Sequence, residues 1–204
     1  MFVDRKDWSY NREKCFEDII VNQRKPDDVC LDIGSHYGQW TIPMAKASGK
    51  VYAVEPTSKT IDILLENIKL NNLTNVEIIP KVAHAISGKM MQLFTHEKQP
   101  AFNCTIGYQR DVGKVERTEV ESIAIDDLNL EKLDFFKIDT EGAELQIIKG
   151  MIKTIERCHP KFLIEMHEGM GYRIYDILKI LYKYDYKMKA YLYSMQIYIY
   201  GEWK

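Results

Sequence analysis

The sequence lacks long apolar runs and paired cysteines. No apolar stretch among its 204 residues approaches the ~20 residues of a membrane-spanning helix. The first residues, MFVDRKDWSYNREK, are charged and lack the apolar core of a signal peptide. The four cysteines, Cys15, Cys30, Cys104 and Cys158, are far apart, which excludes a paired-cysteine metal motif and fits free thiols in a reducing compartment. We therefore expect a soluble protein of the cytoplasm.

The chain also lacks a strong charge of either sign. Its formal net charge is −2, so the overall electrostatics give no reason to expect a nucleic-acid partner. With 46% hydrophobic and 28% charged residues, the composition excludes a disordered chain. We expect one domain over residues 1–204, with a short extension over residues 1–27 before the first strand. The oligomeric state is left open.

Apolar runs and helical patterns alternate along the chain. Residues 57–72, for example, begin with Thr57 and Ser58 and then place apolar residues at helical spacing. Residues 85–123 interrupt the alternation with short β-like pieces, and we expect a β excursion or loop there. Strands are expected at residues 28–34, 50–56, 75–84, 133–139 and 161–168, and helices at 39–49, 57–72, 143–158 and 172–185.

Strand–helix alternation predicts a mostly parallel sheet with helices on both faces. The last two apolar runs, residues 186–193 and 195–203, flank a turn at Ser194 and are expected to form an antiparallel hairpin. The expected fold is therefore α/β, with a doubly wound, mostly parallel sheet of about seven strands. Ligands of such sheets lie beyond the carboxyl ends of the central strands.

The stretch VCLDIGSHYGQWT places an acid and two glycines at the end of the first expected strand. Asp32 ends the apolar run, and Gly34 and Gly38 follow. A dinucleotide-binding turn needs G-x-G-x-x-G, but His36 stands at the middle glycine, where it would crowd a pyrophosphate. A ligand with a nucleoside and an amino-acid tail but no phosphate fits better, and S-adenosylmethionine (SAM) is such a ligand. The alternative is a plain strand-to-helix turn that needs glycine.

Glu55 ends the second expected strand, roughly twenty residues after the glycine turn. Its carboxylate can accept hydrogen bonds from both hydroxyls of a ribose. The alternative is that Glu55 caps the helix that starts at Thr57 or Ser58. Polar residues also end the third, fourth and fifth expected strands, and their gathering at one edge of the sheet predicts a binding site there.

Six motifs, in order over roughly residues 28–168, resemble the FkbM-type methyltransferases, a family of SAM-dependent enzymes. They are LDIGSHYGQWT, VEP, NNLTNVEIIPKVAHAISG, SIAIDDL, FKIDTEGAELQIIKG and FLIEMHE. The resemblance implies a class I, Rossmann-like methyltransferase fold. It also implies methyl transfer to a hydroxyl oxygen of a carbohydrate or other small hydroxylated acceptor. His36 and Tyr37 depart from the family's opening motif, which leaves the acceptor open.

The resemblance also implies roles for individual residues. It places the Asp32 turn around the cofactor, Glu55 on the ribose and the corner at residues 82–84 beside the adenine. Asp139, Glu141 and Glu144 belong to the family block near the methyl group. Gly34 is expected to leave room for the amino-acid tail of SAM, so that Gly34→Val should abolish binding without unfolding the protein. The full set expected to bind the cofactor is Asp32, Gly34, Ser35, Gly38, Glu55, Pro56, Val82, Ala83, His84 and Asp139.

Methyl transfer to an alcohol needs a positioned acceptor and a base for its proton. By the two-residue period of a strand, Lys137 and Asp139 share one face, as do Glu165 and His167. The candidate catalytic residues are Asp139, Glu141, Glu165 and His167. Each has a structural alternative. Asp139 or Glu165 would pair with a buried Lys137, Glu141 would start the next helix, and His167 would only be hydrogen-bonded. Glu144 is expected to be a first-turn acid of that helix.

The four candidate catalytic side chains would also make an oxygen-and-nitrogen set for Mg²⁺ or Mn²⁺. We assign no metal, and a divalent ion stays a disfavoured alternative, because the sequence gives no geometry. Two rival functions stay open. The missing middle glycine disfavours an NAD-type dinucleotide-dependent oxidoreductase, and the strand-end acids disfavour a non-catalytic nucleoside-binding or scaffold protein. The expected partner is a small-molecule or glycan acceptor, with no nucleic acid and no membrane.

Overall fold

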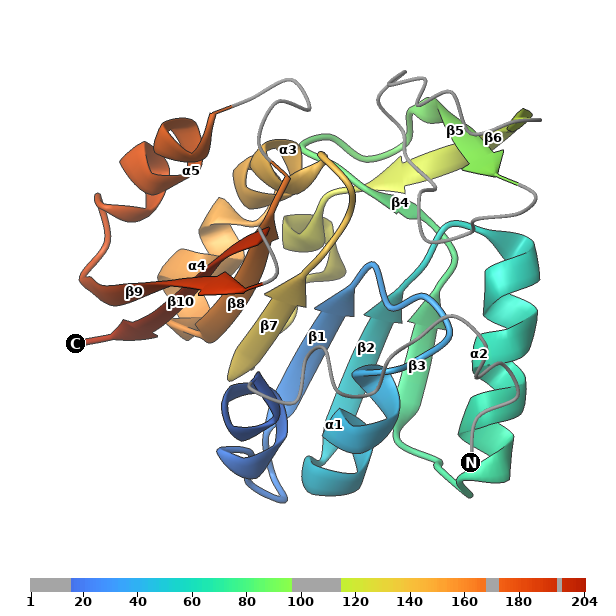
Figure 1. The fold of residues 1–204 in the computed structure, drawn as a ribbon, viewed down its shortest axis with the longest axis horizontal. Helices are drawn as coiled ribbons and strands as arrows, with labels where there is room; N and C mark the ends of the chain where they lie inside the picture. Colours follow the sequence, from blue (N-terminus) through green and yellow to red (C-terminus); the bar gives the residue numbers. More distant parts are fainter. Residues whose placement is uncertain (1–15, 97–114, 168–172, 194–195) are drawn as a thin grey trace.

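A computed structural model describes residues 16–96, 115–167, 173–193 and 196–204. Within these ranges, one sheet contains seven strands in the order β3-β2-β1-β7-β8-β10-β9 (Figure 1). The parallel strands are β1 (Val29–Ile33), β2 (Lys50–Val54), β3 (Val76–Ile79), β7 (Phe135–Ile138) and β8 (Lys161–Met166). The predicted doubly wound, mostly parallel sheet is therefore confirmed.

The predicted C-terminal hairpin is also present. Strand β10 (Gln196–Trp203) lies between β8 and β9 (Tyr186–Tyr193) and runs antiparallel to both. The turn predicted at Ser194 lies outside the described residues. The hairpin thus extends the sheet on the β8 side (Figure 1).

Side chains alternate between the two faces of the sheet and build a core on each. Cys30 and Phe135 belong to one core, with residues of α1 (Thr41–Ala47). Leu31 and Phe136 belong to the other, with residues of α3 (Glu144–Lys149), α4 (Ile152–Cys158) and α5 (Ile174–Leu181). Pro43 lies in the first turn of α1, as predicted, where no backbone N–H is needed. Helix α2 (Ser58–Leu70) confirms the helix expected over 57–72.

Two predicted elements are each divided in the structure. The strand expected over 75–84 ends at Ile79, because Pro80 has no N–H to continue the ladder. Its second part is β4 (Val82–Ala83), which joins a separate small sheet of order β4-β6-β5. The expected β excursion supplies the other two strands, β5 (Met90–His96) and β6 (Val115–Ile123). Residues 97–114 lie outside the description.

The helix expected over 143–158 is broken into α3 and α4 at Gly150 and Met151. A Cβ on Gly150 would lie 2.2 Å from the carbonyl oxygen of His84, so the chain passes too close for any other residue. Helix α4 has its own start, because the Asp126 carboxylate accepts the N–H groups of Lys153 and Thr154 at 3.1 and 2.7 Å. The prediction of one continuous helix was therefore wrong.

The described part of the expected N-terminal extension contributes to the core. A π-helical segment, Asp18–Asn22, packs against α1, and Phe16, Ile19 and Ile20 are buried. These side chains cover the same face of the sheet as α1. Residues from 16 onward therefore belong structurally to the sheet domain.

Candidate active site

The turn after β1 is tied to the end of β2. The N–H groups of Gly34 and Ser35 donate to the carbonyl oxygen of Val54 at 3.0 and 3.2 Å. Asp32 is fully buried, and its Oδ2 accepts a hydrogen bond of 2.6 Å from Oγ1 of Thr41. Sequence reasoning did not single out Thr41, although it closes the LDIGSHYGQWT motif. The turn is thus a fixed feature at the carboxyl end of the sheet.

Two buried oxygen atoms at the start of this turn, on residues 32 and 35, accept no hydrogen bond within the described part of the chain. They are Oδ1 of Asp32 and Oγ of Ser35. Oδ1 lies 3.8 Å from Nζ of Lys137, which is an ion-pair distance and too long for a hydrogen bond. Buried polar atoms are normally satisfied, so these two positions suit a ligand that carries hydrogen-bond donors.

Gly34 is required for chain packing, and its role in leaving room for a ligand stays a prediction. A Cβ at Gly34 would lie 1.9 Å from the carbonyl oxygen of Asp139, and φ is +77°. Any side chain would therefore push the ends of β1 and β7 apart. The expectation that Gly34→Val still folds normally is contradicted by this geometry. Gly38 is similarly confined, since its Cβ would lie 2.6 Å from Cδ1 of Leu64.

Glu55 joins the glycine turn to the start of α2. Its Oε2 accepts the N–H of His36 at 3.1 Å, and its Oε1 accepts the N–H of Thr57 at 2.9 Å. Thr57 is the residue that precedes α2, so Glu55 does support the helix start. A carboxylate offers about four acceptor positions, so these bonds do not exclude a ribose as a further partner. Burial raises the pKa of Glu55, and the bonds from Thr57 and His36 only partly counter this.

The corner expected to contact an adenine lies beyond the main sheet. Val82 and Ala83 form β4 and are buried, and the N–H of His84 donates to the carbonyl oxygen of Ile123 at 2.8 Å. Figure 1 shows β4 above the carboxyl ends of β1, β2 and β3. Contact of this corner, and of Pro56, with a ligand stays a prediction.

Lys137 lies between two carboxylates at the ends of β1 and β7. Its Nζ is 3.2 Å from Oδ2 of Asp139 and 3.8 Å from Oδ1 of Asp32. The predicted ion pair of a buried Lys137 is therefore confirmed with Asp139. Burial alone would raise the pKa of Asp139, but the charges of Lys137 and His167 outweigh it and hold this pKa below its ordinary value. Asp139 is thus a carboxylate at neutral pH.

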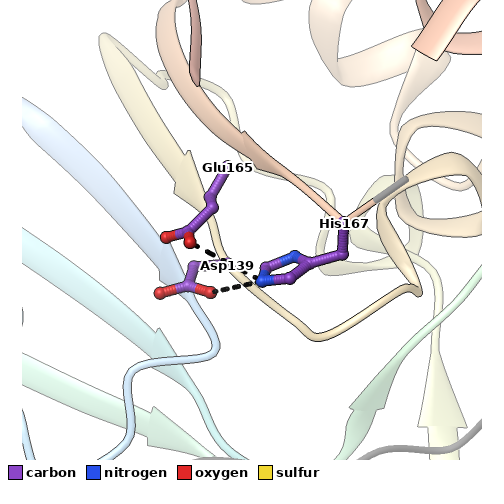
Figure 2. A group of neighbouring side chains, drawn as sticks. All are labelled: Asp139, Glu165 and His167. Carbon is purple, nitrogen blue, oxygen red and sulfur yellow. Dashed lines mark ion pairs between the residues drawn. The ribbon is translucent and has the colours of Figure 1, made fainter. Parts of the chain in front are cut away.

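The carboxyl ends of β7 and β8 bring three candidate catalytic residues together. The register pairs Ile138 with Ile164, so Asp139 and Glu165 follow on adjacent strands. Figure 2 shows the carboxylates of Asp139 and Glu165 facing the ring of His167. One ligand atom from each residue lies within 4.8 Å of those of the other two. The convergence expected from the two-residue period of each strand is therefore present.

His167 contacts a carboxylate through each ring nitrogen. Nδ1 lies 2.8 Å from Oε1 of Glu144. Nε2 lies 3.6 Å from Oε1 of Glu165, 3.6 Å from Oε1 of Glu141 and 3.9 Å from Oδ1 of Asp139. Burial alone would lower the pKa of His167, but the hydrogen bond to Glu144 and the surrounding carboxylates raise it to about 10. Without a bound cation the ring is protonated at neutral pH, so it cannot act as the base that its ordinary pKa suggested.

The resemblance placed Glu144 in the family block near the methyl group, but its contact with His167 was not predicted. Glu144 stands in the first turn of α3, as predicted, but it is fully buried and directed at His167. Its Oε1 also accepts the N–H of Gly142 at 3.0 Å. Glu141, expected as a cap or first-turn acid, precedes α3 in a turn with φ of +51°. The structural alternative for Glu141 is therefore wrong, because it lies before α3 and its N-cap, and Glu141 instead faces His167 from the loop at 3.6 Å.

The comparisons with known proteins agree with this arrangement. The family model described as the methyltransferase FkbM domain matches residues 32–188. The chain belongs to the FkbM methyltransferase family. The match covers every strand end discussed above, so the predicted family and its class I, Rossmann-like methyltransferase fold are confirmed.

Relatives of this FkbM-family chain are distant in sequence. Hexuronic acid methyltransferase AglP of Haloferax volcanii is 24% identical over 163 residues, which cover 80% of this chain and 65% of AglP. The crystal structure of methyltransferase FkbM from Methylobacillus flagellatus superposes with a TM-score of 0.66 at 16% identity, covering 87% of this chain and 44% of that one. The chain thus spans less than two thirds of these relatives.

A third similarity concerns a structure of nearly the same length. The SMU.1697c protein of Streptococcus mutans, solved in complex with S-adenosylhomocysteine (SAH), has a TM-score of 0.61 at 14% identity. The similarity covers 94% of this chain and 97% of that chain. At this identity the likeness concerns the fold, which is that of a SAM methyltransferase. Within the described ranges of the FkbM-family chain, no helix is long and apolar enough to cross a membrane.

Proposed function

We propose that this chain transfers the methyl group of SAM to a hydroxyl oxygen of a carbohydrate or other small hydroxylated acceptor. The observation that carries the proposal is the contact between two groups of residues at one edge of the sheet. Lys137 lies 3.8 Å from Asp32 of the glycine turn and 3.2 Å from Asp139 of the acid cluster. A cofactor held by the turn would therefore present its reactive end to the cluster.

The cofactor is S-adenosylmethionine, as family membership and the SAH complex of the same fold indicate. The residues present fit this molecule. The buried Oδ1 of Asp32 and Oγ of Ser35 can accept hydrogen bonds from its ammonium group, and Glu55 can accept those of its ribose hydroxyls. When bound, SAM supplies a methyl group that its positively charged sulfur makes electrophilic.

The chain's own part in the reaction is to position the acceptor and to take up its proton. The carboxylates of Asp139, Glu141 and Glu165 converge where the acceptor hydroxyl would bind, and Lys137 keeps Asp139 ionised. A hydroxyl hydrogen-bonded to a carboxylate is oriented for in-line attack and can pass on its proton. Because His167 is already protonated in the unliganded site, the proton goes to a carboxylate.

The acceptor class rests on a relative. AglP is named as a hexuronic acid methyltransferase, and it aligns with 80% of this chain. An acceptor bearing several hydroxyl groups also suits a site whose polar groups are mainly acceptors. A cytoplasmic location belongs to the same proposal, because Cys30 and Cys158 are free thiols in the described part of the chain.

A transfer assay with SAM labelled in its methyl group tests the proposal. Purified protein would be incubated with uronic-acid oligosaccharides, neutral oligosaccharides and ribosomal RNA, and label would be counted in each. The expected result is label in an oligosaccharide, lost in the Asp139→Asn variant and retained in Glu66→Gln, a change at an exposed position of α2. Label in RNA alone, or in none of the acceptors, would contradict the proposed acceptor.

A further inference from the structure

Asp139, Glu165 and His167 present three ligand atoms to one small volume at the carboxyl ends of β7 and β8 (Figure 2). We propose that this set binds a divalent metal ion, through Nε2 of His167 and one carboxylate oxygen each of Asp139 and Glu165. The ion is a transition metal such as Mn²⁺. The site goes beyond methyl transfer as proposed above, since neither the family match nor the fold assigns a metal to these residues.

The distances suit a shared ion. Two ligand atoms bound at ~2.1 Å to one octahedral ion lie ~3.0 Å apart when adjacent and ~4.2 Å apart when opposite. Nε2 of His167 lies 3.6 Å from Oε1 of Glu165 and 3.9 Å from Oδ1 of Asp139. Both values fall between these limits. They also exceed a hydrogen-bond length, so the ring is not placed to donate directly to either carboxylate.

The orientation of His167 is fixed as in metal sites. Glu144 accepts at Nδ1 over 2.8 Å, which leaves Nε2 directed toward Asp139 and Glu165. Histidine ligands of metals almost always donate their other N–H to a carboxylate or carbonyl, which sets the tautomer. Glu144 is completely buried. Burying a carboxylate costs desolvation free energy, so its contact with His167 is not a chance surface contact.

The charges around the three ligand atoms also favour a bound cation. The site holds the carboxylates of Asp32, Asp139, Glu141, Glu144 and Glu165. Within the described residues, the ion-pair partners of these carboxylates are Lys137 and His167. A divalent ion would add positive charge to this buried, acidic volume.

The donor set narrows the identity of the ion. One imidazole nitrogen and two carboxylate oxygens suit Mn²⁺, Fe²⁺, Co²⁺ or Zn²⁺ better than Ca²⁺, which takes oxygen ligands. The three protein ligands leave coordination positions for an acceptor hydroxyl. A role of the ion in binding the acceptor rests on the proposed function. With the ion in place, an acceptor hydroxyl held beside it would pass its proton to Glu141, whose Oε1 lies 3.6 Å from Nε2 of His167. The hydroxyl oxygen would then bond to the methyl carbon of SAM as the carbon–sulfur bond breaks, with that bond's electron pair left on sulfur.

The test is a titration of the full chain with Mn²⁺ alone. Free Mn²⁺ is measured at each step from its electron paramagnetic resonance signal, and bound Mn²⁺ is obtained by difference. The expected result is one saturable Mn²⁺ per chain. His167→Ala and Glu165→Gln should each abolish this binding. Glu144→Gln should weaken it by about 10–100-fold, because it removes only the group that orients the ligand. Glu66→Gln, on the exposed face of α2, is the matched control and should bind Mn²⁺ normally.

The outcomes separate this inference from methyl transfer. Absence of saturable Mn²⁺ binding, or equal binding by His167→Ala and the unaltered chain with the same circular dichroism spectrum, would overturn the metal site. Binding that survives Glu165→Gln as well as His167→Ala would mean adventitious surface carboxylates. SAM affinity, measured on the same samples by calorimetry, reports separately on the proposed function.

Discussion

At the scale of single residues, the carboxylate of Asp139 belongs to two networks. One oxygen lies 3.2 Å from Nζ of Lys137, and the other lies 3.9 Å from Nε2 of His167. Sequence periodicity could place Asp139 and Lys137 on one face, because that depends on strand geometry alone. It could not show that Glu144 fixes His167, because the contact depends on how the turn before α3 folds back onto β8.

Asp139→Asn tests the importance of that charge. The amide keeps the shape but removes the negative charge that orients the acceptor and neutralises Lys137. We expect turnover to fall by roughly 10²–10⁴-fold, the usual range for acid–base catalysis, with little change in SAM affinity. Steady-state kinetics and calorimetry would be run on the same preparation. A fully active variant would exclude Asp139 from the reaction, whereas a large loss of melting temperature would point to a role in stability.

Glu55→Gln tests ribose binding while keeping part of the support of α2. The amide oxygen can accept only one of the two backbone N–H groups, those of His36 and Thr57, that Glu55 binds at 3.1 and 2.9 Å. We expect SAM binding to weaken by about 1–3 kcal/mol, the cost of weakening a hydrogen bond to a charged acceptor. Calorimetry gives the affinity, and thermal melting checks the fold. Unchanged affinity in a folded variant would restrict Glu55 to capping the helix.

At the scale of elements, the sequence predicted the strands and helices well where a period was long and uninterrupted. Helix α2 and the C-terminal hairpin are such cases. The errors came from tertiary contacts. Gly150 breaks the predicted helix where it meets the backbone of His84, and β4 leaves the main sheet to pair with β6. His84 and β6 are both far along the chain from the elements they contact, so no local sequence pattern could predict where these elements end.

The junction between β1 and β7 makes a prediction of its own. Gly34 and Gly88 both have φ of +77°, but a Cβ at Gly34 would meet the Asp139 backbone at 1.9 Å whereas one at Gly88 would meet nothing within 4 Å. We expect Gly88→Ala to lose about 1–2 kcal/mol of unfolding free energy from backbone strain alone. Gly34→Ala should lose a further ~1–3 kcal/mol or more from overpacking.

Urea unfolding of both glycine variants measures the difference directly. Equal losses of unfolding free energy would mean that β1 and β7 can move apart at no cost. Glycine would then be needed at position 34 only for its positive φ. A larger loss at Gly34 supports the account in which the glycine turn holds β1 against β7. A side chain at Gly34 would also displace the backbone of Asp139, which it would contact. We therefore expect SAM affinity to change in the Gly34 variant.

At the scale of the whole molecule, one edge of the sheet carries most of the groups with a proposed chemical role. Asp32, Glu55, Asp139, Glu165 and His167 come from four different strand ends, which the parallel topology brings together (Figure 1). Alternation along the sequence was sufficient to predict this edge. The acceptor could not be predicted in the same way, because its contacts depend on side-chain shape around the cluster and on the parts of the longer relatives that this chain does not match.

Calorimetric titration of the unaltered chain with SAM, SAH and NAD tests the central claim most directly. Our account predicts saturable one-to-one binding of SAM and SAH, strongly reduced in Asp32→Asn, and no binding of NAD, because His36 occupies the position that a pyrophosphate needs. Binding of NAD with no response to SAM would contradict the account.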